Sequence, residues 1–395
     1  MAKYEVINKY QGLAGLIGPG GQVMRIGIPT ETKDNEYRVG IVPSGVEELV
    51  RHGHNVLIQA GAGEGSSISD EEFMGAGATI LPDAPALWES SELIMKVKEP
   101  LLPEYDLMKK GQLLFAFLHL APLPDLVDVL MERRIRAVAF ETIQAADGSL
   151  PLLAPMSQVA GKMAVQLGAA FLQKEKGGIG RLLGGVPGTK HGRIVIIGGG
   201  NVGISAAKVA YGLGAEVVII DTDHSRLSYI DDVFDGKVVT LMSNSRNIRE
   251  AAASCDMLVG AVLLPGALAP RIVTREVLKG MRPGSVFVDV SIDQGGMAET
   301  SRATSHSEPT YVEEGIIHYC VPNIPGSVPA TSTIALTNVT MPYCLRLAAD
   351  PEEALRTDPG LALGANTWDG HITCEPVAEA LGREWKEIGA LIREA

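Results

Sequence analysis

The sequence has few cysteines, and they follow no pattern that would make them ligands or crosslinks. Cys255, Cys320, Cys344 and Cys374 are scattered, and no two of them form a C-x-x-C pair. No group of histidines has the spacing of zinc ligands. We therefore expect no metal site, and ordinary thiols in a reducing compartment.

Long apolar runs and an excess of positive charge are also missing. No stretch reaches the roughly 18 apolar residues that cross a membrane, and no signal-peptide pattern opens the chain. The formal net charge of −13 disfavours nucleic acids and anionic membranes, because both reward clustered lysine and arginine. We expect a cytoplasmic protein with no nucleic-acid and no membrane partner.

What is present favours alternating strands and helices in about two domains. The 395 residues exceed one ordinary core, and 46% of them are hydrophobic. Short apolar strands alternate with helical stretches from Arg25 to about Pro151, a pattern that predicts a parallel sheet with crossover helices. Strands are predicted at 26–29, 56–59, 93–97, 113–118, 137–140, 257–262 and 286–290, and helices at 45–51, 70–76, 123–133, 156–174, 337–349 and 376–391.

One segment carries the pattern of a dinucleotide-binding turn. The apolar run 194–197 leads into Gly198, Gly200 and Gly203. The first glycine permits a tight turn, the second lets the backbone approach a pyrophosphate, and the third lets the helix 204–213 pack close to the strand. The amides at the start of that helix, with their partial positive charge, would face the phosphates.

Asp221 indicates which dinucleotide is bound. It ends a second apolar run, where a carboxylate accepts from the ribose 2′-hydroxyl and repels a 2′-phosphate. The sequence therefore predicts NAD rather than NADP. Arg226 is the counter-indication, because an arginine near this site can receive a 2′-phosphate; the other interpretation is a solvated helix residue.

Four ionisable residues follow predicted strands, where open α/β sheets bind their ligands. They are Arg38, Lys98, His119 and Asp293. An arginine clamps a carboxylate through two hydrogen bonds, a lysine polarises a carbonyl oxygen, a histidine exchanges a proton near neutral pH, and an aspartate orients water or stabilises a cationic imine. These types suit an anionic substrate that gives up a hydride.

Each of the four also has a purely structural interpretation. Arg38 could be a surface residue of a polar loop, and Lys98 could belong to a solvated charge run. His119 lies in an aromatic stretch and could be a core histidine, and Asp293 could cap a turn. The pattern alone leaves these alternatives open.

Taken together, the motifs around these residues resemble those of the alanine dehydrogenases. The likeness covers about Met24 to the C-terminus. It departs from the usual residues at Ser291 and at Pro322 and Ile324. The matching stretches are 27–33 with Arg38 and Val39, 96–100, 118–121, 151–157, 184–188, 260–262, 293–296, 331–333 and 335–338.

The resemblance implies reversible oxidative deamination of L-alanine to pyruvate and ammonium with NAD. Arg38 and Lys98 would bind the substrate carboxylate and carbonyl oxygen, His119 would be the acid/base residue, and Asp293 would assist it. A homo-oligomer, usually a hexamer, is also implied. The cofactor-binding candidates, from the glycine pattern and the resemblance together, are Ser157, Gly198, Gly200, Val202, Gly203, Asp221, Arg226 and Asn323.

The resemblance also implies a substrate domain formed by both ends of the chain around a central NAD domain. We therefore predict an α/β fold with two doubly wound, Rossmann-like domains and mostly parallel sheets, the substrate domain being discontinuous. The predicted segments are a leader or tag-like extension at 1–23, the first part of the substrate domain at 24–151, the NAD-binding domain at 152–329 and a helical C-terminal part of the substrate domain at 330–395.

Two other functions share this scaffold. One is the NAD-binding, hydride-transferring component of a transhydrogenase, which has no need of a substrate site made by Lys98 and His119. The other is a non-catalytic NAD-sensing protein, which has no need of acid/base residues. Activity with L-alanine and NAD separates both from the main hypothesis.

Overall fold

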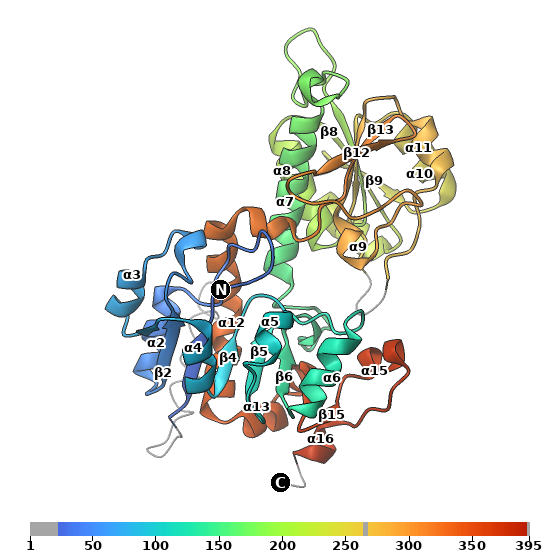
Figure 1. Ribbon diagram of the computed structural model, residues 1–395. Helices are drawn as coiled ribbons and strands as arrows, with labels where there is room; N and C mark the ends of the chain where they lie inside the picture. Colours follow the sequence, from blue (N-terminus) through green and yellow to red (C-terminus); the bar gives the residue numbers. More distant parts are fainter. Residues whose placement is uncertain (1–22, 264–267, 393–395) are drawn as a thin grey trace. The chain divides into compact units, whose positions relative to one another are not determined.

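The computed structural model describes residues 23–263 and 268–392, which form two compact units. Unit 1 contains residues 23–153 and 328–392, and unit 2 contains the described part of 154–327 (Figure 1). The chain passes between the two units after residue 153 and after residue 327, and each of these boundaries lies two residues from a predicted domain boundary. The predicted extension at 1–23 lies outside the described residues, apart from Val23.

The sheet of unit 1 has eight strands in the order β15-β14-β6-β5-β4-β1-β2-β3. The six strands from β1 to β6 are parallel, and β14 and β15 add antiparallel neighbours at the β6 edge. The strands are β1 Arg25–Ile28, β2 Asn55–Gln59, β3 Thr79–Leu81, β4 Leu93–Met95, β5 Leu113–Ala116, β6 Arg136–Ala139, β14 Ala365–Trp368 and β15 His371–Ile372.

Crossover helices connect the parallel strands of unit 1. Leu87, Leu126 and Val377 come from three of the helices and belong to one apolar cluster with alternate residues of the central strands. The cluster buries one face of the sheet, as expected where parallel strands are covered by helices. The helices of unit 1 are α2 Pro43–Arg51, α3 Asp70–Gly75, α4 Ala84–Ser90, α5 Leu102–Tyr105, α6 Pro124–Glu132, α12 Pro329–Ala349, α13 Pro351–Thr357, α14 Pro359–Ala362, α15 Glu375–Leu381 and α16 Ile388–Leu391.

The sheet of unit 2 has seven strands in the order β12-β13-β11-β10-β7-β8-β9. All are parallel except β12, which forms an antiparallel hairpin with β13. The strands are β7 Arg193–Ile197, β8 Glu216–Asp221, β9 Val239–Met242, β10 Met257–Gly260, β11 Val286–Asp289, β12 Thr310–Glu313 and β13 Ile316–Tyr319.

Helices cover both faces of this sheet. Ile194 and Ile196 of β7 lie in an apolar cluster with α7 and α8, whereas Val195 and Ile197 lie in a second cluster with α10 and α11. Successive strand residues point to opposite faces, so a strand buried on both sides is apolar throughout. The helices of unit 2 are α7 Ala154–Phe171, α8 Asn201–Gly212, α9 His224–Val233, α10 Ser245–Ala253 and α11 Arg275–Gly280. The predicted doubly wound α/β fold is confirmed.

The C-terminal part differs from its prediction. It is not only helical, because β14 and β15 extend the sheet of unit 1. The helix predicted over 376–391 is also wrong, since α15 ends before Gly382 and α16 begins at Ile388. Gly382 has a φ of 63°, a left-handed conformation that stops a helix. Within the described residues, no helix combines the length and the apolar character needed to span a membrane.

Candidate active site

In unit 1 the strand order reverses between β1 and β4. Strand β1 pairs with β2 on one side and with β4 on the other. Sheets of this kind bind ligands beyond the carboxyl ends of the strands at such a reversal. Arg38 follows β1, Lys98 follows β4, and His119 follows β5, the next strand along the sheet. Three predicted site residues therefore follow three adjacent strands.

Arg38 is buried, so the alternative interpretation as a surface residue of a polar loop is wrong. Only 2% of the residue is exposed, and its guanidinium forms a bidentate ion pair with Glu36. The Nε and Nη2 groups donate to Glu36 at 2.7 and 2.6 Å. A guanidinium has five N–H donors in a fixed plane, so Glu36 fixes the plane in which further acceptors must lie.

Lys98 is also buried, at 8% exposure, and does not belong to a solvated charge run. Its ammonium lies 5.9 Å from the ring centroid of Phe117, within the range of a cation–π interaction. Its backbone N–H donates to the carboxylate of Glu31 at 3.3 Å. The residue is thus held both at its backbone and along its side chain.

Glu31 belongs to a buried cluster of charges next to Lys98. Its side chain lies 3.6 Å from the Nζ of Lys96, which also contacts Glu104 at 2.5 Å. Burial raises the pKa of Glu31 to about 7, although Lys96 and the N–H of Val97 oppose that shift. Burial alone would lower the pKa of Lys96, but Glu31 and Glu104 raise it above its ordinary value. The cluster keeps a positive charge buried between two carboxyl groups.

His119 is not a core histidine. Its side chain is 45% exposed, and its ring stacks parallel to that of Phe117 at 5.9 Å. Its backbone has a φ of 47°, in the left-handed region that few non-glycine residues adopt. Glu141 accepts the backbone N–H groups of Leu118 and His119, the latter at 2.6 Å, and lies 3.9 Å from Nδ1 of the ring. An exposed imidazole facing a carboxylate suits proton exchange.

In unit 2 the glycine turn follows β7, at the second reversal of strand order, since β7 pairs with both β8 and β10. Gly198 has a φ of 103°, which favours glycine. A Cβ at Gly203 would overlap the carbonyl oxygen of Gly198, whereas a Cβ at Gly200 would meet nothing within 4 Å. The backbone conformation thus favours glycine at the first position, and packing requires it at the third. The second glycine leaves open space beside the backbone.

The open space lies at the start of α8. Gly200 is the N-cap residue, and no side chain caps the first amides of the helix. Uncapped amides with the positive end of the helix dipole form a ready anion site. The residues present therefore fit the pyrophosphate of a dinucleotide.

Asp221 and Arg226 both contact the glycine turn. The Asp221 carboxylate accepts the backbone N–H of Gly199 at 2.5 Å and that of Asp223 at 2.8 Å. The Nε of Arg226 donates to the carbonyl oxygen of Gly199 at 2.5 Å, and its guanidinium lies 5.4 Å from the ring of Tyr229. Arg226 is therefore not a free solvated residue, and its charge stands beside the turn.

Ser157 and Val202 occupy the junction of α7 with α8. A Cβ at Gly161 of α7 would overlap the carbonyl oxygen of Val202, so the two helices are in close contact there. Ser157 is one turn earlier on α7, and residues four apart share a helix face. Ser157 accordingly belongs to the face of α7 that meets the first turn of α8.

Asp293 and Asn323 are brought together, although they are thirty residues apart. The exposed Asp293 accepts the backbone N–H of Asn323 at 3.2 Å, and Asn323 has a φ of 57°. The turn that carries Asp293 is capped instead by the buried Asp289, which accepts the N–H of Ser291. Ser291, a departure from the family pattern, donates through its hydroxyl to the carbonyl oxygen of Val262 at 2.7 Å.

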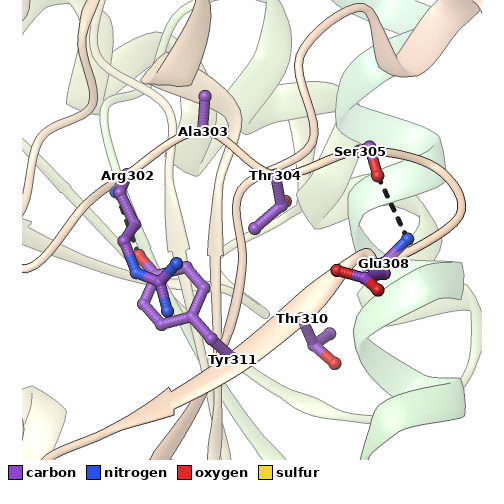
Figure 2. A pocket seen from close by; sticks show the side chains of 7 residues that line it. All are labelled: Arg302, Ala303, Thr304, Ser305, Glu308, Thr310 and Tyr311. Carbon is purple, nitrogen blue, oxygen red and sulfur yellow. Dashed lines mark hydrogen bonds between the residues drawn. The ribbon is translucent and has the colours of Figure 1, made fainter.

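A pocket elsewhere on unit 2 contains none of the predicted site residues. Figure 2 shows its polar lining, with the guanidinium of Arg302 over the ring of Tyr311 and the hydroxyl of Ser305 accepting the backbone N–H of Glu308. The lining comes from β12, the edge strand, and from the segment before it. It therefore belongs to neither strand-order reversal.

The sequence analysis missed three carboxylates that support the site. Glu31, Glu36 and Glu141 hold the backbone or side chains of Lys98, Arg38 and His119. Glu141 directly follows the predicted strand 137–140, so the strand-end rule that found His119 could also have found it. Glu31 and Glu36 lie in the loop after the first strand, where sequence alone does not show what a carboxylate contacts.

Two family models match the chain, one for each half. The model "Alanine dehydrogenase/PNT, N-terminal domain" matches residues 27–160, and "Alanine dehydrogenase/PNT, C-terminal domain" matches residues 164–375.

Individual relatives agree with the family models. An alanine dehydrogenase of Methanococcus maripaludis is 54% identical over 359 residues, covering 90% of this chain and 96% of that protein. A solved L-alanine dehydrogenase has 49% identity and a TM-score of 0.88, covering 91% and 99%. A solved transhydrogenase from Sinorhizobium meliloti has 24% identity and a TM-score of 0.77, covering 89% and 99%, which shows a shared fold. The chain belongs to the alanine dehydrogenase/PNT family.

Proposed function

We propose that this protein is an NAD-dependent L-alanine dehydrogenase, which converts L-alanine reversibly to pyruvate and ammonium. The observation that carries the proposal is 54% identity to an alanine dehydrogenase over 90% of the chain. The arrangement of the strand ends supports it, because a buried arginine and a buried lysine follow β1 and β4. Such a pair suits a small substrate with a carboxylate and a carbonyl oxygen.

We propose that unit 1 is the substrate domain and unit 2 the NAD domain. In unit 2, the glycine turn and the first amides of α8 would hold the pyrophosphate, and Asp221 the ribose hydroxyls. Ser157, Arg226 and Asn323 are the remaining cofactor contacts of the proposal. When bound, NAD supplies the acceptor for the hydride that leaves the alanine α-carbon.

In unit 1, Arg38 would bind the substrate carboxylate in the plane that Glu36 fixes. Lys98 would stabilise the negative charge that develops on the substrate oxygen. Oxidation of the amine leaves an imine, to which water adds before ammonium departs. His119 would take the proton of that water and return it to the leaving amine, and Asp293 would assist.

The decisive experiment is an initial-rate assay of the purified protein with L-alanine and NAD. We expect NADH formation with alanine, and a lower rate when NADP replaces NAD. Hydride exchange between NADH and NADP analogues without alanine turnover would instead indicate a transhydrogenase component. Binding of NADH with no turnover of any small amino acid would indicate a sensing protein.

We also propose that the protein is a cytoplasmic homo-oligomer, specifically a hexamer, as the resemblance implies. Light scattering on the purified full chain measures its mass directly. A mass of one chain, 41.8 kDa, would contradict an oligomer.

A further inference from the structure

We propose that Glu31 is a positioning residue for Lys98. Its carboxylate joins the segments that follow β1 and β4, the two strands between which the strand order of unit 1 reverses, and so keeps the lysine at a fixed place beside the substrate. This inference rests on the proposed function, because it assigns Lys98 to the substrate oxygen. Glu31 itself touches no reacting atom, since it acts through the backbone that carries Lys98.

The first observation is where the backbone pairing between β1 and β4 stops. The register pairs Ile26 with Leu93 and Gly27 with Ile94, and no further pair is formed. Beyond that point the chains leaving the two strands no longer share ladder hydrogen bonds. Parallel strands separate in this way where a sheet opens to bind a ligand.

The second observation is that the Glu31 side chain links the two segments by hydrogen bonds beyond the last backbone pair of β1 and β4. Glu31 follows β1, and its Oε1 accepts the backbone N–H of Val97 at 2.6 Å while Oε2 accepts that of Lys98 at 3.3 Å. Both donors follow β4. One carboxylate thus joins the segments that leave two adjacent strands, and hydrogen bonds to an ionised acceptor are stronger than neutral ones.

The third observation is the burial of this carboxylate. The Glu31 side chain is 1% exposed, and Lys96, fully buried, lies 3.6 Å away. A buried carboxylate without partners is costly, and the two N–H groups and the ammonium offset part of that cost. Glu104 contacts the same ammonium but accepts from Leu101 and Thr32 instead of from Val97 or Lys98. Glu31 alone of the two acids holds the lysine-bearing turn.

The test compares Glu31→Gln with Glu104→Gln in the full-length protein. Each variant replaces one carboxylate that faces Lys96, so both disturb the buried ion pair. Only Glu31→Gln places an amide NH₂ against backbone donors at Val97 and Lys98. We expect kcat for alanine oxidation to fall by about 10- to 100-fold in Glu31→Gln, the range typical of a misplaced catalytic group, with an unchanged Kd for NADH. Glu104→Gln should keep a kcat close to the wild type.

A second readout does not depend on activity. Hydrogen–deuterium exchange of the NADH-bound protein should show faster exchange at Val97 and Lys98 in Glu31→Gln but not in Glu104→Gln. Equal losses of kcat in the two variants, or unchanged exchange at these amides, would overturn the inference. If the wild type has no alanine activity, the proposed function fails, while the exchange measurement still decides whether Glu31 holds the turn.

Discussion

Buried or half-buried carboxylates that accept backbone N–H groups support each side chain of the proposed site. Glu31 holds the turn of Lys98, Glu141 that of His119, and Asp289 the turn that carries Asp293. Such bonds are charge-assisted and fix backbone positions that regular sheet pairing does not reach. The functional side chains thus depend on neighbours whose own chemistry is structural.

Glu31 should make the stability of the protein depend on pH in a defined direction. Its pKa is raised by burial from 4.5 to about 7 in the folded chain, so between these values the folded state binds a proton that the unfolded state has lost. That contribution is complete below the unfolded value and is lost as the pH rises through about 7. Lys96, Glu36 and Glu104 are the charged groups that face Glu31.

The measurement is the free energy of unfolding of wild type and Glu31→Gln across this pH range. Glutamine does not titrate, so the stability of the wild type relative to the variant should increase as the pH is lowered from about 8 to about 5. A difference that stays constant, or one that grows toward alkaline pH, would show that the folded-state pKa of Glu31 is not raised.

Replacement of Glu141 should affect turnover more than cofactor binding. Glu141→Gln removes the carboxylate that accepts two backbone N–H groups and faces the His119 ring. Because His119 would be misplaced rather than lost, we expect kcat to fall by about 10- to 100-fold, with the Kd for NADH unchanged. Steady-state kinetics and NADH fluorescence check the two parts. Glu132→Gln, on the exposed surface of α6, is the control, and equal activity of both variants would contradict a role for Glu141.

At the level of elements, α8 depends on its close approach to the glycine turn. Gly203→Ala would place a methyl group on the carbonyl oxygen of Gly198, so the helix would have to move from the turn. We expect weaker NADH binding and a loss of stability in the range of about 1–3 kcal/mol, typical of overpacking. Calorimetry and NADH titration measure both quantities.

Gly212 provides a matched control in the same helix. A Cβ there meets nothing within 4 Å, so Gly212→Ala should leave NADH binding unchanged. Its stability should rise by up to about 1 kcal/mol, because alanine restricts the unfolded chain more than glycine does. Equal effects at Gly203 and Gly212 would refute the steric explanation.

For the whole chain, α12 joins the C-terminal segment to the N-terminal part of unit 1. The Thr333 hydroxyl accepts the backbone N–H of Val39 at 3.3 Å and lies 2.7 Å from the hydroxyl of Ser66. Thr333→Val leaves these buried groups without that partner, which typically costs about 1–3 kcal/mol. Chemical denaturation of the variant gives the value.

Thr337, one turn later on α12, tests the specificity of this effect. It is 2% exposed, and its hydroxyl has no hydrogen-bond partner among the described residues. Thr337→Val should therefore keep or raise the stability, since a buried unpaired hydroxyl is replaced by a methyl group of the same shape. Similar losses in both variants would argue against the hydrogen bonds of Thr333.

Local sequence patterns are sufficient to predict the fold class, the glycine turn and the strand ends that carry ionisable residues. These features are local: apolar runs form buried strands, and the turn after β7 requires glycine at fixed places. The sequence did not predict β14 and β15, because β14 forms by pairing with β6, far away in the chain, and β15 forms by pairing with β14. β14 has the sequence ANTW and is not an apolar run, and β15 has only two residues, so neither has the pattern of a buried strand.

The residues that surround the functional side chains, in contrast, depend on how distant segments pack together. The burial of Arg38 and Lys98 and the exposure of His119 reverse what their neighbours in sequence favour, because the exposure of a side chain depends on how the whole unit packs. Glu31 meets Val97 and Lys98 across 66 and 67 residues, where β1 and β4 lie side by side. Such contacts follow from strand order, which local sequence does not encode.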